Sequence, residues 1–174
     1  PAKNGTASNY SSIQSYPGEW AIIDGQHACR CTLGRTTETG TYSNLSYWLV
    51  QRLGITGGTV SSPYSIGGGL CFGRGPFTIR YCSFYNNVHS GDGGENPGGI
   101  RTYRMRDSII EYNYFSNNGT TGSNDNAADI VNFSDYEWNR TGQYGFDNTG
   151  EFIKNNIIRY NYFAGGGGSS HKHK

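Results

Sequence analysis

The segments VQRLGI (residues 50–55), IRYCSF (79–84), IEYNYF (110–115) and IRYNYF (158–163) share one strand pattern. Each begins with an aliphatic residue and carries isoleucine or phenylalanine five positions later. Their starts are separated by 29, 31 and 48 residues, and such intervals are typical of a repeated coil rather than of a heptad. The pattern therefore predicts one structural unit that recurs along the chain.

A second pattern runs in phase with the first. The segments GGGLCF (67–72), GGIRTY (98–103) and ADIVNF (128–133) place Leu70, Ile100 and Ile130 at intervals of 30 residues. Each coil then holds at least two short strands with turn residues between them. Parallel pairing normally needs a helical crossover, but no segment has the spacing of an amphipathic helix. We therefore expect an all-β fold, a right-handed parallel β-helix (solenoid) of about five coils.

The repeat also predicts which side chains face the interior. The first and last positions of the pattern form two apolar columns, one of Val50, Ile79, Ile110 and Ile158 and one of Ile55, Phe84, Phe115 and Phe163. Asn113 and Asn161 take the same position at the bend between the columns, where a side-chain amide can bond backbone groups of the next coil. This asparagine ladder is expected to be structural and not catalytic.

A single repeat over 174 residues indicates one domain, residues 1–174. Residues 134–150 are expected to be a surface-loop insertion, and residues 164–174 a Gly-rich C-terminal tail or a final partial coil. The charge is nearly balanced, with 14 Lys and Arg against 13 Asp and Glu. Without a basic stripe we expect no nucleic-acid partner, and no stretch is long and apolar enough to span a membrane. The sequence shows no signal peptide, as expected of a mature secreted chain or an excised fragment.

The four cysteines do not follow a zinc-binding spacing, because paired C-x-x-C units are missing. Disulfides in an oxidising compartment are one interpretation, with three connectivities open. We expect Cys82 to be a core residue in place of a ladder asparagine. Whether Cys29, Cys31 and Cys71 form disulfides is left undecided by the sequence.

The opening stretch NGTASNYSSIQSYPGEWAIIDGQ (residues 4–26), together with the IRYNYF-type coils, resembles secreted bacterial right-handed β-helix proteins of the pectate-lyase-like superfamily. The resemblance covers nearly the whole chain and implies an extracellular protein. It is specific for the fold group and not for one reaction, since such relatives include lyases, hydrolases, epimerases and tailspikes. Neither end shows the capping helix usual in that superfamily, which indicates either a slice of a longer protein or ends covered by other chains.

Candidate catalytic residues come from the outward positions of the second strand. If Leu70, Ile100 and Ile130 point inward, then Cys71, Arg101 and Val131 point outward onto an exposed face. Continuing the register adds Lys172, so that Arg101, Tyr103, Asp129 and Lys172 gather on one face. A lyase acting on a uronic acid polymer needs a cation for the carboxylate and a base for the α-proton. We predict Arg101, Lys172 and Tyr103 as catalytic residues; the alternative is a set of ordinary solvated side chains.

A possible metal site follows from acidic residues one coil apart. Glu95 and Asp125 each precede a strand residue, Ile100 and Ile130, by five positions. Stacked carboxylates can bind a cation, and an all-oxygen set suits Ca²⁺. The predicted ligands are Glu95, Asp125, Asp129 and Asp92, and the alternative is polar turns that face water.

Aromatic residues are the third candidate group. Tyr136, Trp138 and Tyr144 belong to the insertion and are predicted to bind substrate by stacking on sugar rings, or else to pack within the loop. Trp20 and Trp48 are expected to pack on the coil exterior under loops.

Three functions fit these patterns. The first is an extracellular β-helix protein that binds or cleaves polysaccharide, with an acidic glycan as the expected ligand, and the sequence does not decide between binding and catalysis. The second is a non-enzymatic protomer that stacks end to end into an extracellular filament. The third is a piece of a tailspike or adhesin whose partner surface lies elsewhere.

Overall fold

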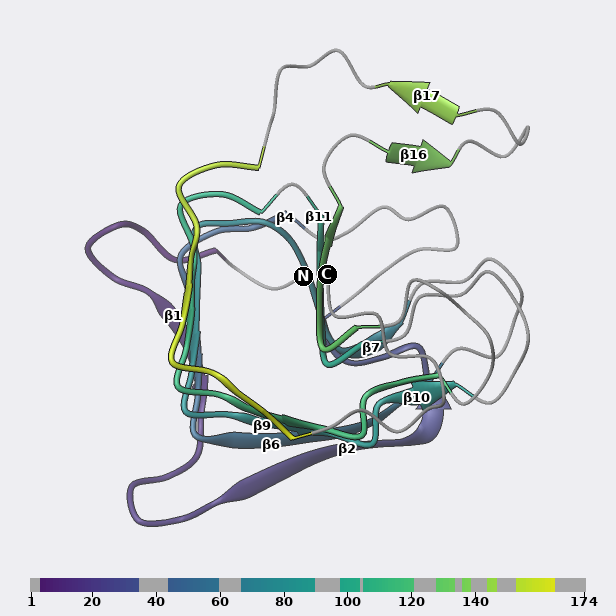
Figure 1. Cartoon of the computed structure of the whole chain (residues 1–174). Helices are drawn as coiled ribbons and strands as arrows, with labels where there is room; N and C mark the ends of the chain where they lie inside the picture. Colours follow the sequence, from purple (N-terminus) through teal and green to yellow (C-terminus); the bar gives the residue numbers. More distant parts are fainter. Residues whose placement is uncertain are drawn as a thin grey trace.

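The computed structural model describes residues 4–34, 44–59, 67–89, 98–103, 105–120, 128–133, 136–138, 144–146 and 153–164. These residues form strands and turns and no helix. The strands of three larger sheets all pair in parallel, an arrangement consistent with a parallel β-solenoid (Figure 1).

The three sheets are three sides of the stack, and each takes one strand from successive passes of the chain. The first sheet contains, in order, β1 (Ser11–Gln14), β5 (Trp48–Gln51), β8 (Phe77–Arg80), β12 (Ile109–Glu111) and β18 (Ile157–Arg159). The second contains β2 (Ala21–Cys29), β6 (Leu53–Gly58), β9 (Ser83–Tyr85), β13 (Tyr114–Ser116) and β19 (Tyr162–Ala164). The third contains β3 (Cys31–Gly34), β7 (Gly68–Arg74), β11 (Ile100–Tyr103) and β15 (Ile130–Phe133), with β4 (Asn44–Leu45) also on β7.

Two smaller pairings complete the described strands. Parallel β10 (Val88–His89) and β14 (Gly119–Thr120) follow the second sheet. Within the predicted insertion, β16 (Tyr136–Trp138) and β17 (Tyr144–Phe146) form an antiparallel hairpin that pairs with none of the three larger sheets.

The register agrees with both sequence patterns. In the first sheet Val50 pairs with Ile79, Ile79 with Ile110, and Ile110 with Ile158. In the third sheet Ile100 lies between Leu70 and Ile130. The predicted alignment of the strands is therefore confirmed.

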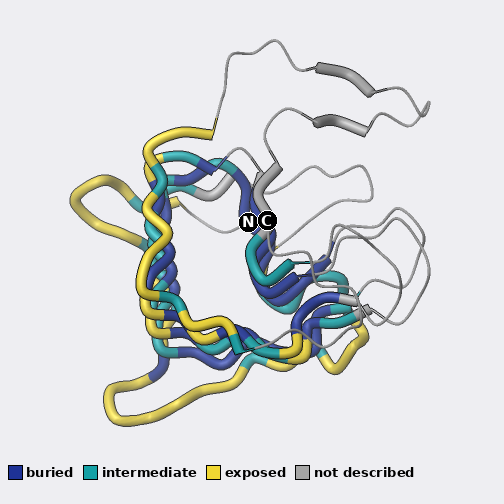
Figure 2. The backbone as a smooth tube through the Cα atoms, viewed as in Figure 1, coloured by how far each residue is buried: buried dark blue, intermediate teal, exposed yellow. Residues whose placement is uncertain are grey.

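The core lies between the sheets, and Figure 2 shows how buried residues recur along successive strands of the stack. Val50, Ile79 and Ile110 are fully buried, as are Ile55, Phe84 and Phe115. The last residues of the two predicted columns differ, because Ile158 is 50% exposed and Phe163 is 44% exposed. No described strand follows β18 or β19, so these two side chains are covered on one side only.

At several corners between sheets a left-handed residue is followed by a polar side chain turned into the stack. At the corner between the first and second sheets, the Asn113 Nδ2 donates to the Ile79 carbonyl at 3.1 Å and to the Asn161 Oδ1 at 3.0 Å. This is the predicted asparagine ladder. A second ladder, not predicted from the sequence, joins the Asn87 Nδ2 to the Asn118 Oδ1 at 2.9 Å at the far end of the second sheet.

Cys82 occupies the ladder position one coil before Asn113, and it is buried and free, as predicted. Burial raises the pKa of its thiol to about 12, although hydrogen bonding to the Leu53 backbone lowers it in part. Cys82 is therefore a neutral core side chain at any ordinary pH.

Candidate ligand-binding site

Tyrosine occupies the corner between the first and second sheets on three consecutive strands. Tyr81, Tyr112 and Tyr160 directly follow β8, β12 and β18, and each has a positive φ of 53–55°. Positive φ is uncommon outside glycine, and asparagine and aspartate are the other residues that tolerate it best. At two other corners asparagine or aspartate stands at the left-handed position, Asn86 and Asn117 at one and Asp107 and Asn155 at the other, where Tyr47 also has a positive φ of 59°.

The three tyrosine rings stack on one another along the solenoid. The ring centroids of Tyr81 and Tyr112 are 5.2 Å apart, and those of Tyr112 and Tyr160 are 5.0 Å apart, with interplanar angles of 10° and 18°. On the adjoining face of the second sheet, Tyr114 stacks on Tyr162 with centroids 5.7 Å apart. All five side chains are exposed, with Tyr112 at 44% and Tyr160 at 66%.

Stability alone gives little reason for tyrosine at this corner. A left-handed conformation costs a residue with a Cβ atom about 1–2 kcal/mol, and an aromatic pair contributes about 0.5–1.5 kcal/mol. Ring stacking therefore does no more than offset the free-energy cost of the left-handed backbone conformation. At the other corners the Asn117 Nδ2 donates to the Asn86 Oδ1 at 2.6 Å, and the Asn155 Nδ2 donates to the Asp107 Oδ1 at 2.9 Å. Strained residues that cluster on a surface are a reason to look for a function there.

The tyrosines border a shallow, open hollow of about 430 Å³. Trp20 also lines this hollow, and it lies at the end of the exposed loop between β1 and β2, a loop seen at the lower left of Figure 2. The lining contains no Asp, Glu, Lys, Arg or His side chain; it consists of Trp20, Tyr81, Cys82, Ser83, Tyr112, Asn113, Tyr114, Tyr160 and Tyr162.

A polar column runs beside the tyrosines on the outer face of the first sheet. The Arg80 Nε donates to the Gln51 Oε1 at 2.9 Å, and the Arg159 guanidinium pairs with Glu111 at 2.8 Å. The hydrogen bond to Glu111 raises the pKa of Arg159 above its ordinary value. These arginines are thus held by side chains of their own column, outside the hollow.

The structure overturns the predicted exposure of Arg101 and Cys71. Both side chains are 0% exposed, and Cys71 forms a disulfide with Cys31. Strand alternation was used to predict their orientation, but alternation does not reveal what covers a face. Tyr103 follows on the same strand, β11, with its side chain outside the described part of the structure, and Lys172 lies outside the described residues altogether.

Of the four predicted metal ligands, only Asp129 lies within the described residues. Its Oδ1 accepts a hydrogen bond of 2.9 Å from the Asn118 Nδ2, so this carboxylate closes an asparagine ladder. Glu95, Asp125 and Asp92 lie outside the described residues. Within the described ranges, no three His, Cys, Asp or Glu side chains gather where they could hold a metal ion.

The aromatic residues of the insertion lie on the hairpin of β16 and β17. Tyr136 and Trp138 are the ends of β16, and Trp138 pairs with Tyr144 in the antiparallel register. The backbone register therefore brings Trp138 and Tyr144 to opposite positions. Their predicted role in substrate binding stays a prediction.

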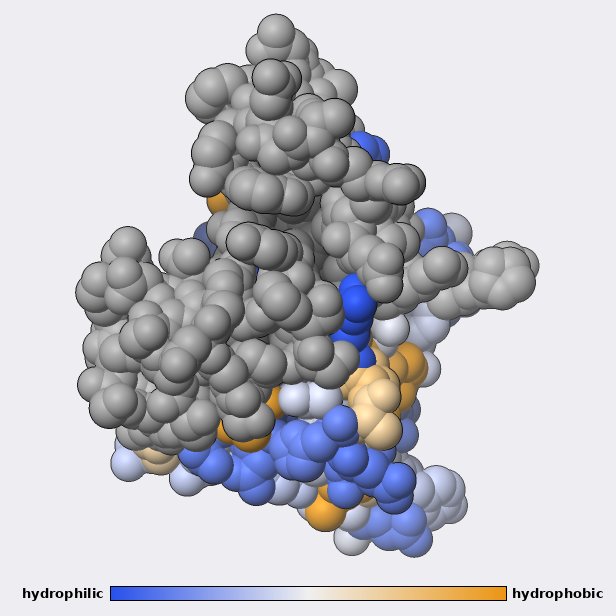
Figure 3. All heavy atoms as spheres, turned by 90° about the vertical axis from the view of Figure 1, so that its right-hand side faces the viewer, coloured by the Kyte–Doolittle hydropathy of each residue, from blue (hydrophilic) through white to orange (hydrophobic). Residues whose placement is uncertain are grey.

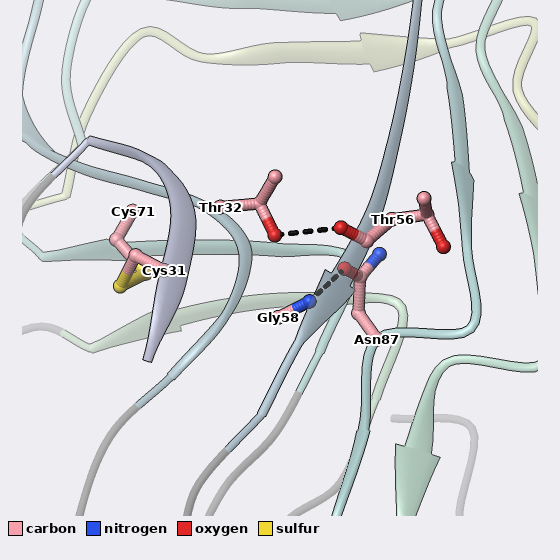
Figure 4. Close-up of a disulfide and its surroundings, with 6 residues drawn as sticks. All are labelled: Cys31, Thr32, Thr56, Gly58, Cys71 and Asn87. Carbon is pink, nitrogen blue, oxygen red and sulfur yellow. Dashed lines mark hydrogen bonds between the residues drawn. A yellow bond between two sulfur atoms is a disulfide. The ribbon is translucent and has the colours of Figure 1, made fainter. Parts of the chain in front are cut away.

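The disulfide joins neighbouring strands of the third sheet. Cys31 of β3 and Cys71 of β7 have Cα atoms 5.9 Å apart (Figure 4). Nearby, the Thr32 hydroxyl donates to the Thr56 carbonyl at 2.8 Å, and the Gly58 N–H donates to the Asn87 Oδ1 at 3.0 Å. Cys29 is free and half-buried.

The tyrosine corner was missed at the sequence level, although the sequence holds its signal. Tyrosine stands third in IRYCSF, IEYNYF and IRYNYF, directly before the bend. The repeat predicts the inward positions, whereas this tyrosine lies at an outward one. Trp20 was expected to pack under loops, whereas it is 51% exposed at the edge of the hollow. Trp48 was expected to pack on the exterior, whereas it packs partly buried against the core.

The side of the molecule shown in Figure 3 differs from the tyrosine corner. Among the described residues visible there, hydrophilic ones predominate, and hydrophobic ones form small separate areas. The part of the chain that the structure describes contains no helix suited to crossing a membrane.

Comparison of this chain with protein-family models, with curated proteins and with solved structures found no match.

Proposed function

We propose that this chain is an extracellular right-handed β-solenoid of about five coils that binds polysaccharide along the corner between the first and second sheets. The observation that carries the proposal is the triple use of exposed, stacked tyrosine at a left-handed position. Aromatic rings offer an apolar surface and a hydroxyl edge, which match the C–H faces and hydroxyl groups of sugars.

Two further observations support the proposal. The corner continues over consecutive strands, so the exposed rings follow the axis of the stack and suit a long polymer. The disulfide of Cys31 and Cys71 is typical of proteins in oxidising, extracellular surroundings.

Binding, and not cleavage, is the activity we propose for this hollow. General acid–base catalysis needs a group whose pKa lies near the working pH. The hollow is lined by no carboxylate, imidazole or amine, and the pKa of its Cys82 thiol is raised to about 12. Cleavage by Arg101, Lys172 and Tyr103 would take place elsewhere and would require the buried Arg101 to become accessible.

The test compares Tyr112→Asn with the wild-type protein. Asparagine tolerates the left-handed backbone, so the variant is expected to fold, while both ring contacts of Tyr112 are lost. The matched control is Tyr16→Asn, because Tyr16 is exposed but does not line the hollow. Binding to hydroxyethyl cellulose, xylan, polygalacturonate and alginate is measured by affinity electrophoresis.

We expect at least one polymer to slow the wild type and the Tyr16→Asn control, and Tyr112→Asn to lose most of that retardation. If none of the polymers binds, or if Tyr112→Asn binds as the wild type does, the proposal is wrong.

A second candidate function is end-to-end stacking of copies into an extracellular filament. The observation in its favour is the half-exposed Ile158 and Phe163, because their columns are fully buried in the preceding coils. A second copy would continue both columns. Electron microscopy of the purified protein tests this candidate: long unbranched fibres would support it, and dispersed single particles would reject it.

A further inference from the structure

One position interrupts the aromatic column on the outer face of the second sheet. The register aligns Gly54, Ser83, Tyr114 and Tyr162 on successive strands. Tyr114 stacks on Tyr162 with one face of its ring. On the opposite side the neighbouring position is Ser83, whose small side chain leaves that space without a ring.

Trp20 closes the other side of this space. A Cβ atom of residue 54 would stand 3.1 Å from the Ile22 Cγ1, 3.2 Å from the Trp20 Nε1 and 3.5 Å from the Tyr85 Cε1, so the absence of a side chain on Gly54 leaves room for the indole and for these two neighbours. Trp20, Ser83 and Tyr114 all line the same hollow. The strands of Gly54 and Tyr114 are two strand spacings apart, or about 10 Å. Two strand spacings leave room for one flat ring over the small side chain of Ser83.

The chemistry of the lining decides which ring this is. Tyr81 and Tyr112 border the space laterally, and Cys82 and Asn113 also line it. The Asn113 amide is engaged in the ladder inside the stack, so the space offers aromatic surfaces and hydroxyl groups and no charge. A sugar ring with a carboxylate would lose part of its hydration in this space and would find no cationic side chain in the lining to compensate, which is energetically unfavourable. Arg80 and Arg159 are already engaged by Gln51 and Glu111.

We infer that the space over Ser83 is a subsite for one uncharged pyranose ring, held between Trp20 and Tyr114. The inference rests on the proposed polysaccharide binding and goes further, because it names the ring-binding position and selects uncharged over acidic polymers. The C–H faces of the sugar stack on the two aromatic side chains, and its hydroxyl groups meet Ser83 and the tyrosine hydroxyls at the edge.

The test fills the space with a side chain. Ser83→Tyr adds a ring next to Tyr114 and occupies the subsite covalently. The matched control is Ser116→Tyr, because Ser116 is also half-buried, lies on the same sheet and pairs with Tyr85 as Ser83 pairs with Tyr114. Circular dichroism and the melting temperature report whether both variants fold. Binding of hydroxyethyl cellulose (uncharged) and polygalacturonate (acidic) is measured at low and high salt.

We expect the wild type and Ser116→Tyr to bind hydroxyethyl cellulose more tightly than polygalacturonate, with little effect of salt. Ser83→Tyr is expected to lose at least tenfold in affinity. If Ser83→Tyr does not fold, Trp20→Ala replaces it, since Trp20 lies at an exposed loop, and the same loss is expected.

The two proposals fail in different ways. Retained binding by Ser83→Tyr or Trp20→Ala, together with loss of binding by Tyr112→Asn, would overturn the subsite and leave the proposed function standing. Tighter, salt-sensitive binding of polygalacturonate would overturn the uncharged class of ligand. Absence of binding by the wild type to these two polymers and to xylan and alginate would remove the inference together with the function on which it rests, and binding to alginate alone would overturn the uncharged class of ligand.

Discussion

The side-chain Nδ2 of Asn113 donates to the side-chain Oδ1 of Asn161 at 3.0 Å, although 48 residues separate them along the chain. The Asn113 Oδ1 in turn accepts the N–H of Cys82 at 2.9 Å. The amide of one coil thus bonds the coils before and after it. Asn113 is buried. If its side chain were removed, water could not reach these backbone groups to replace the lost hydrogen bonds.

Replacement of Asn113 by alanine is therefore expected to be strongly destabilising. The variant leaves the Cys82 N–H and the Ile79 carbonyl unsatisfied, and each buried unsatisfied group costs about 1–3 kcal/mol. Urea denaturation should show a loss of about 2–4 kcal/mol in the free energy of unfolding. Asn161→Ala serves as the comparison, because Asn161 is only half-buried. An equal or larger loss in Asn161→Ala would contradict this account.

Replacement of Cys82 by asparagine should extend the ladder by one coil. The Leu53 backbone N–H already hydrogen-bonds the Cys82 thiol, and an asparagine Oδ1 can accept it instead. The new amide would also reach Asn113, as Asn113 reaches Asn161. The free energy of unfolding is expected to be unchanged or raised by about 1 kcal/mol. Cys82→Ala provides the reference for the loss of packing. A Cys82→Asn protein less stable than Cys82→Ala would refute the prediction.

Alkaline pH is expected to destabilise the protein through Cys82. Burial raises the pKa of this thiol from 9.0 to about 12 in the folded state. Between these pH values the folded state keeps the proton and the unfolded state has lost it, so stability falls as pH rises. The contribution is fully present below about pH 9 and is lost as pH approaches 12. Between pH 9 and 11 the wild type should lose about 2 kcal/mol more than Cys82→Ala does.

Urea denaturation of both proteins across that pH range measures the difference, and the comparison removes the effects of groups that the two proteins share. Parallel stability curves for the two proteins would show that Cys82 does not titrate as expected.

Loss of the disulfide should lower stability through the unfolded state. The bond joins positions 40 residues apart, and closing a loop of that length corresponds to about 4 kcal/mol in the chain-entropy description. The double variant Cys31→Ala/Cys71→Ala is expected to approach this loss. A reducing agent should destabilise the wild type by a similar amount and leave the double variant unaffected. Equal sensitivity of both proteins to the reductant would refute the assignment.

The inward half of the fold could be predicted because its signal repeats in the sequence. Val50, Ile79 and Ile110 recur at nearly constant spacing, and parallel pairing places equivalent residues side by side. The disulfide partner of Cys71 could not be predicted in this way. Cys31 belongs to β3, where Leu33 pairs with Leu70, but the surrounding sequence lacks the Gly-rich pattern of the later strands.

The outward half could be predicted far less well. Strand alternation placed Arg101 opposite the inward Ile100, yet it gave no information about the covering that leaves Arg101 fully buried. The hollow beside Tyr112 depends on Ser83 and Gly54 being small and on Trp20 reaching over from another loop. Such a site arises from differences between coils, whereas the repeat reveals what the coils share.

The covalent link between β3 and β7 has a consequence for the protein under mechanical load. In a solenoid each coil is held by its neighbours, so tension applied to the two ends would peel strands away one after another. Cys31 and Cys71 are 40 positions apart in the sequence, and the segment between them cannot lengthen the chain while the bond holds. Under oxidising conditions about 140 Å of contour length therefore cannot be extended. The reduced protein would reach a fully stretched length greater by that amount.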